Sequence, residues 1–204
     1  MGRHRFEGQI AGVGTASGVR LVIGRWVRSP WGPFADVMVE QADDHRVLLA
    51  PDDRVAEFVG ATYSFDEVCR TPVRVTTGPT VWRVDAGPLQ VCVDVGTRPV
   101  IGSLLRLVPR RVAGTATWAG IVDPVARIVL RGVRTRGSAG AGRREWYAAT
   151  DLHRVTAVAG TWRGKDLGDL RPVRPPVHFG FGSTPAMPSV TDVVTTVADD
   201  DCRR

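Results

Sequence analysis

The chain has 204 residues, of which 43% are hydrophobic and 24% charged, and its net charge is +6. This length suits one compact domain, and this apolar content excludes a chain that is disordered throughout. No apolar run reaches the about 18 residues of a membrane-spanning helix, and the first residues lack the apolar core of a signal peptide, so the sequence predicts a cytoplasmic protein without a transmembrane segment.

The positive charge is concentrated in the second half of the chain. Residues 1–100 carry a net charge of −1 and residues 101–204 carry +7, with many arginines between 106 and 144. Such a region can bind nucleic acid or another anionic surface. However, 26 of the 27 basic residues are arginine, which indicates a general preference for arginine in this chain. A solvated basic face is therefore favoured, and nucleic-acid binding is the less favoured alternative.

The first half of the chain reads as a series of short strands. Weak alternation predicts a strand at 6–13, and a run of β-branched residues predicts another at 19–27. Two prolines then break the chain before a third strand at 34–40. A fourth strand, at 46–50, leads into a short helix near 52–60, which Asp52 would cap.

The strand at 34–40 has two different faces. Phe34, Asp36, Met38 and Glu40 fall on one face, and the small apolar residues between them fall on the other. In a closed barrel, acids beside Phe and Met would form the wall of a polar-lined pocket. In a half-exposed strand, the same acids would lie in water, and the sequence leaves both interpretations open.

The remaining elements are further strands and one helical insertion. Strands are predicted at 63–76, 80–85 and 89–95, and again at 145–150, 152–162 and 189–197. Helical spacing of apolar residues predicts an insertion near 100–131. A glycine-rich loop is expected at 136–144 and a disordered tail at 198–204. Together these elements predict a single domain, 1–197, that is mostly β, in a closed antiparallel β-barrel or cone.

Several stretches resemble acetoacetate decarboxylase-like proteins. The sequence Gly-Pro-Phe-x-Asp at 32–36 resembles the Gly-Pro-Tyr-x-Glu strand of that family. The stretch Leu-Leu-Ala-Pro-Asp at 48–52, with the helix that follows it to Gly60, is similar to the strand and helix that lead to the family's Gly-Arg-Glu. The resemblance implies a related barrel that encloses a cavity.

Two departures from the family pattern concern its chemistry. Ala61 and Thr62 stand where the family has the Arg-Glu pair, and Val68 stands where it has the lysine that forms a Schiff base. Schiff-base chemistry needs an amine, which valine lacks. The lysine of this chain, Lys165, lies in a glycine-flanked turn. The resemblance therefore implies the barrel and its cavity without the family's Schiff-base decarboxylation.

Two hypotheses concern this cavity. In the first, the protein binds a small apolar or organic-acid ligand, and the ligand-binding residues are Arg25, Asp36, Glu40, Glu67, Arg143, Arg144 and Trp146. In the second, it is an enzyme that acts on a small organic acid or ketone by acid/base chemistry, with Asp36, Glu67 and His153 as candidate catalytic residues.

No metal or cofactor is predicted. The four histidines show none of the spacings typical of zinc ligands, and the three cysteines do not form a CxxC pair. The predicted partner of the protein is a small-molecule ligand.

Overall fold

The computed structural model describes residues 3–106, 136–139, 143–180 and 184–199, with the backbone alone at residues 3, 136–139, 143–147 and 198–199. Within these residues the fold is mostly β, as the sequence predicts, and contains two helices. The elements are β1 (Arg3–Thr15), β2 (Arg20–Arg28), β3 (Phe34–Glu40), β4 (Arg46–Ala50), α1 (Asp53–Thr62), β5 (Glu67–Arg70), β6 (Arg74–Thr77), β7 (Val81–Ala86), β8 (Leu89–Val95), α2 (Val100–Arg106), β9 (Arg136–Ala139), β10 (Arg143–Trp162), β11 (Lys165–Asp166), β12 (Leu170–Arg171) and β13 (Ser189–Asp199).

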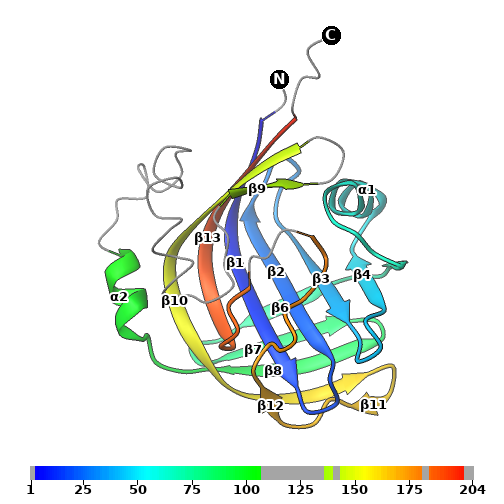
Figure 1. Cartoon of the computed structure of the whole chain (residues 1–204), viewed down its shortest axis with the longest axis vertical. Helices are drawn as coiled ribbons and strands as arrows, with labels where there is room; N and C mark the ends of the chain where they lie inside the picture. Colours follow the sequence, from blue (N-terminus) through cyan, green and yellow to red (C-terminus); the bar gives the residue numbers. More distant parts are fainter. Residues whose placement is uncertain (1–2, 107–135, 140–142, 181–183, 200–204) are drawn as a thin grey trace.

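The strands form one strongly curled sheet (Figure 1). Its strand order is β5-β4-β3-β2-β1-β13-β10-β8-β7-β6, and the neighbours are antiparallel except for the parallel pair β4 and β5. Strand β10 has 20 residues. Its first half pairs with β13 and its second half pairs with β8. The sheet bends along β10, which therefore belongs to both sides of the bend. The two strands predicted at 145–150 and 152–162 are therefore one strand, with a register shift between Ala149 and Asp151.

The predicted closed barrel is wrong, because the sheet is an open half-barrel. Strands β5 and β6 lie at the two ends of the strand order, and no pairing joins them within the described residues. The sequence suggested one strand through 63–76, but the chain turns between Arg70 and Arg74. Pro72 lies in this turn and has no N–H to donate to a ladder. A closed barrel would need β5 to pair with β6, and the sheet instead ends at these two strands.

A single apolar core fills the inside of the curled sheet. Leu21, Ile23 and Leu49 on one side of the bend, and Leu89 and Trp162 on the other, are almost fully buried in the same cluster. A second, smaller cluster lies on the other face of β4, where α1 packs. Strands β3 and β4 thus place apolar side chains on both faces, one set in the sheet core and the other in the cluster with α1.

The two described helices can be compared with the helical segments that the sequence predicts. Helix α1 begins as predicted after Asp52, whose side chain accepts a hydrogen bond from the Val55 amide at 2.9 Å, and it ends two residues later than expected. Helix α2 is the described beginning of the insertion predicted near 100–131, and residues 107–131 lie outside the description. Neither described helix is long and apolar enough to cross a bilayer.

Two predicted irregular segments contain strand instead. Residues 136–139, expected within a loop, form β9 and pair with β10. Strand β13 continues to Asp199, two residues beyond the predicted end of the domain, and pairs with the start of β1 through Arg3 and Ala198. The rest of the predicted tail, 200–204, lies outside the described residues.

Candidate functional site: a pocket beneath helix α1

A small hollow lies between the face of β1–β3, helix α1 and residues 172–180, a segment that we call the strap. The accessible volume of this α1 pocket is about 60 Å³, the space of roughly two water molecules. Its walls are mainly apolar, and Val22, Phe34, Met38, Phe58, Val177 and Phe179 are among its lining residues.

Asp36 is the acidic residue of the described pocket lining, and it is 3% exposed. It lies in the middle of β3, directly opposite Gly24 of β2. A Cβ atom at position 24 would lie 2.5 Å from the Asp36 Oδ1 atom, so glycine leaves the space that the carboxyl group fills. The indole Nε1 of Trp26 donates a hydrogen bond to this same oxygen at 2.8 Å.

Burial changes the acidity of Asp36 strongly. Loss of water around the carboxyl group disfavours its charged form and raises its pKa from the ordinary 3.8 to about 7, although the hydrogen bond from Trp26 acts in the opposite direction. Among the described residues, no arginine or lysine lines the pocket to offset the buried charge. Asp36 therefore changes its protonation state near neutral pH.

Aromatic rings exclude water from the neighbourhood of Asp36. Phe6 contacts Trp26, Trp31, Phe34 and Phe58, with ring centroids between 5.3 and 6.3 Å apart. Rings at such distances pack in tilted or edge-to-face arrangements that stabilise one another. This cluster encloses one side of the pocket, and its low polarity is the physical cause of the raised pKa of Asp36.

Two further lining residues carry hydroxyl groups without partners. The Oγ1 atoms of Thr184 and Thr195 are buried, and neither has a hydrogen-bond partner among the described residues. A buried hydroxyl without a partner costs on the order of 1–3 kcal/mol. A bound molecule that carried a polar group would offset part of this cost.

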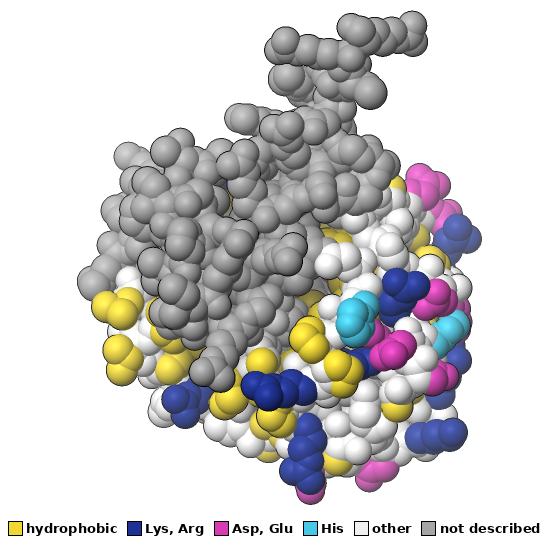
Figure 2. All heavy atoms as spheres, in the orientation of Figure 1, with side chains coloured by type: hydrophobic (Ala, Val, Ile, Leu, Met, Phe, Trp, Pro, Cys, Tyr) yellow, Lys and Arg dark blue, Asp and Glu magenta, His cyan; other side chains and the backbone are white. Residues whose placement is uncertain are grey.

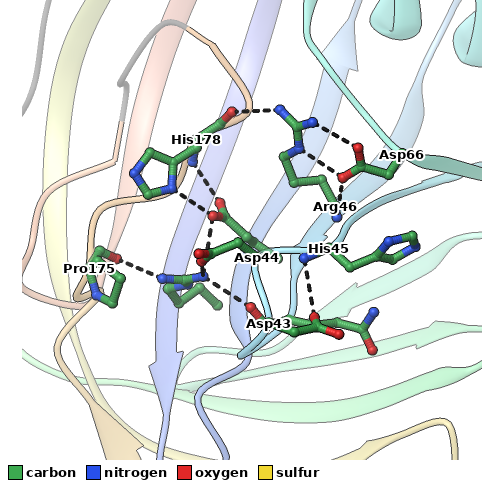
Figure 3. Close-up of polar contacts among 10 residues, drawn as sticks. Asp43, Asp44, His45, Arg46, Asp66, Pro175 and His178 are labelled. Carbon is green, nitrogen blue, oxygen red and sulfur yellow. Dashed lines mark hydrogen bonds and ion pairs between the residues drawn. The ribbon is translucent and has the colours of Figure 1, made fainter.

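The strap is held across the pocket by a polar cluster built on Glu40. Figure 3 shows Asp44, Pro175 and His178 in this region. The Glu40 carboxylate accepts hydrogen bonds from the backbone N–H of His178 at 2.6 Å and contacts the His178 Nδ1 atom at 2.8 Å. Arg20 lies behind it, with Nη2 at 3.2 Å from Glu40 and 2.9 Å from Asp44. Because His178 stands between Val177 and Phe179, these contacts fix two pocket-lining residues.

The same cluster contains three side chains of the kinds that bind metal ions. Ligand atoms of Glu40, Asp44 and His178 lie within 4.8 Å of one another. However, the guanidinium group of Arg20 already contacts both carboxylates and occupies the place of a cation between them. The cluster is therefore better described as a latch for the strap than as a metal site.

Other predicted ligand-binding residues of the first half lie outside the α1 pocket. Arg25 alternates to the opposite face of β2 from Gly24 and Trp26, and its guanidinium donates to the Gln9 side chain at 3.2 Å. Glu67 lies at the sheet edge on β5, where hydrogen bonds from Arg163 at 2.6 and 2.7 Å hold its pKa below the usual range. Glu40 shares a strand face with Asp36 but contacts the strap.

Of the predicted residues of the second half, His153 has a described side chain, and it is not among the residues that line the pocket. His153, on β10, contacts the Gly96 carbonyl through Nδ1 at 3.3 Å and Arg98 through Nε2 at 3.2 Å. Arg143, Arg144 and Trp146 lie in the first part of β10, where the backbone pairs with β9 and β13, and their side chains lie outside the description. Much of the arginine-rich region at 106–144 is likewise undescribed, so its binding of anionic partners stays a prediction.

The sequence did not predict that the strap lines the pocket or that Trp26 donates a hydrogen bond to Asp36. The Gly-x-Trp pattern at 24–26 was a usable signal, because alternation places both residues on one face of β2. The strap residues Val177 and Phe179 are more than 130 positions from Asp36, and nothing local in the sequence brings them together.

Comparisons with known proteins add a distant structural likeness. No protein-family model matches the chain, and no curated protein matches it. Among solved structures it is similar to the crystal structure of acetoacetate decarboxylase from Legionella pneumophila subsp. pneumophila str. Philadelphia 1. The two are 9% identical with a TM-score of 0.45, over 99% of this chain and 89% of that one.

Proposed function

We propose that the protein binds a small, largely apolar molecule in the α1 pocket and holds its single polar group through Asp36. The observation that carries the proposal is the buried Asp36 carboxyl, 3% exposed, among apolar and aromatic lining residues. A few polar groups in an otherwise apolar hollow are typical of ligand sites, where they orient the ligand. The two threonine hydroxyls without partners add further polar points.

The chemistry of the lining favours a neutral ligand over an anion. With a pKa of about 7, Asp36 is largely protonated below neutral pH and can donate a hydrogen bond to a carbonyl or hydroxyl oxygen. No described lining residue supplies a positive charge. An organic acid would therefore bind only by sharing a proton with Asp36, because two ionised carboxylates repel each other.

The size of the pocket limits what fits without movement. A volume of about 60 Å³ accepts only a few heavy atoms, so a larger ligand must displace the strap or α1. The strap is held by polar contacts at Glu40, Arg20 and Arg46, and by the buried Phe179 side chain. We propose that it moves in preference to α1, because it is an irregular segment.

A titration with two ligands of the same shape tests the proposal. We expect 2-butanone to bind at pH 6 and to lose about tenfold in affinity by pH 8, because the protonated fraction of Asp36 falls by that factor. Propanoate should bind more weakly at both pH values. Saturation-transfer NMR measures both affinities.

The matched variant is Asp36→Asn. Its side chain keeps an oxygen for Trp26 and gains an N–H donor that does not titrate, so butanone binding should become independent of pH. Equal pH dependence in both proteins, or no binding of butanone to either, would reject Asp36 as the ligand's polar partner.

A second candidate function is acid/base catalysis on a small ketone in the same pocket. The raised pKa of Asp36 favours it, because a general base works best when its pKa is near the working pH. The ionised Asp36 would take a proton from the ketone α-carbon to give an enolate and return a proton to it. In D₂O, butanone would then exchange its α-protons for deuterons, faster as the pH rises through about 7. Asp36→Asn should abolish this exchange, whereas a pure binding protein shows none.

A further inference from the structure

A second and larger hollow lies farther along the same face of the sheet as the α1 pocket, beside helix α2. This α2 groove has a volume of about 460 Å³, within the range of small-molecule sites. It is formed by the start of α2, by β10, by the first part of the strap and by residues 185–189. The two hollows have no lining residue in common.

The floor of the α2 groove is apolar. Ile101, Leu152, Pro172, Pro185 and Pro188 line it, together with Met187, whose side chain is 65% exposed. Figure 2 shows hydrophobic side chains gathered at the edge of the molecule where α2 lies. An exposed thioether beside proline rings is an adaptable surface for an aliphatic chain.

Two arginines from different elements border this apolar floor. Arg154 projects from β10 and Arg174 from the strap, and both are exposed. Neither forms an ion pair with any residue that the structure describes. No acidic residue is present in the described lining of the groove. The groove therefore combines an apolar surface with positive charge that has not been neutralised.

Ser189 adds a buried polar group. It lines the groove and is 3% exposed, and its Oγ atom has no hydrogen-bond partner among the described residues. Oxygen acceptors of a bound molecule would satisfy this hydroxyl as well as the arginines. Guanidinium groups bind carboxylates well, since their N–H groups match the two oxygens.

We propose that the α2 groove binds an amphipathic carboxylate, with its aliphatic chain on the apolar floor and its carboxylate between Arg154 and Arg174. This site is separate from the α1 pocket and does not depend on the function proposed for that pocket. The charge of the ligand is what distinguishes the two sites: an anion in the groove, a neutral molecule beside Asp36.

Calorimetric titration with octanoate, with octanol as the uncharged counterpart, tests the proposal. Octanoate should bind more tightly than octanol by about tenfold or more, because its carboxylate accepts charge-assisted hydrogen bonds from arginine that are stronger than those to a neutral hydroxyl. The double variant Arg154→Gln/Arg174→Gln should lose this difference. Arg171→Gln, an exposed arginine on the adjoining strand β12 and outside the groove lining, should bind octanoate as the unaltered protein does. Ser189→Ala should weaken binding by a few-fold.

Separate outcomes would overturn the proposal. Octanoate and octanol could bind equally well, octanoate could bind the double variant as tightly as the unaltered protein, or octanoate could fail to bind at all. Loss of octanoate binding in Asp36→Asn, with the groove variants unaffected, would place the ligand in the α1 pocket. A dimer in the ultracentrifuge that the double variant abolishes would assign the groove to a second copy of the chain.

Discussion

Among single residues, Asp36 combines 3% exposure with a hydrogen bond from Trp26 and a pKa raised to about 7. The alternation in 34–40 correctly placed Asp36 on a face with Phe34 and Met38, because side chains alternate along any strand. The raised pKa could not be predicted in this way. It depends on Gly24, Trp26 and the aromatic cluster, which reach Asp36 only through strand register and the packing of α1.

A stability measurement checks the protonation of Asp36. Its pKa is raised in the folded state, so the folded protein binds more protons than the unfolded chain between about pH 4 and pH 7, and stability falls as pH rises through that window. The displacement from 3.8 to about 7 corresponds to on the order of 4 kcal/mol. Asp36→Asn should therefore be more stable than the unaltered protein at pH 8, by up to about that amount, and similar at pH 4.

Urea unfolding of the unaltered protein and of Asp36→Asn, between pH 4 and pH 8, gives the difference in their free energies of unfolding. The carboxyl groups with lowered pKa, Asp66, Glu67 and Asp151, are present in both proteins and cancel. A difference that does not change between pH 4 and pH 8 would show that Asp36 titrates as an ordinary, solvated carboxyl group.

At the scale of elements, regular strands were predictable and their long-range partners were not. Strands β3 and β4 have the predicted bounds, since each has alternating or β-branched residues between clear turn signals. The strap shows no such pattern. Its place is set by Glu40, which is 138 residues from His178 and was expected to contact a ligand.

Loosening the strap tests the role of the latch. His178→Ala removes the Nδ1 contact with Glu40 but keeps the charge of Arg20 paired, so the fold should persist while the strap opens more often. Because the His178 side chain is 59% exposed, we expect a cost of only about 1 kcal/mol and about fivefold faster amide hydrogen exchange at 177–179.

His45→Ala is the matched control for this measurement. His45 is also partly exposed and contacts a glutamate, Glu67, but it lies away from the strap. Mass spectrometry of exchanged peptides compares the two variants. Equal exchange at 177–179 in both would mean that the apolar contacts of Phe179, and not the latch, hold the strap.

At the scale of the whole molecule, one core joins the two halves of the curled sheet. Leu89 of β8 and Leu21 of β2 are both fully buried in the same cluster, although their strands lie on opposite sides of the bend. The sequence predicted enough apolar strands to form such a core. It did not predict where the sheet would end, because closure depends on whether two distant edges meet, and Pro72 separates β5 from β6.

A shared core predicts that the molecule unfolds as one unit. Leu89→Ala should lower the free energy of unfolding by about 2–5 kcal/mol and keep a single transition by both circular dichroism and tryptophan fluorescence. Val68→Ala, on an exposed side chain of the edge strand β5, should change it by less than about 0.5 kcal/mol. Two separate transitions in Leu89→Ala would indicate that the halves of the sheet unfold independently.

The proposed function requires that Asp36, a buried carboxyl group, titrates near neutral pH inside a ligand pocket. The indole N–H of Trp26 reports on it directly, because it donates to the Asp36 oxygen. We would follow this N–H signal by ¹⁵N-resolved NMR from pH 4 to pH 9, with and without butanone. We expect a midpoint near 7 that is absent in Asp36→Asn, and a shifted signal when butanone is added. A midpoint near 4, with no response to butanone, would contradict the proposed function.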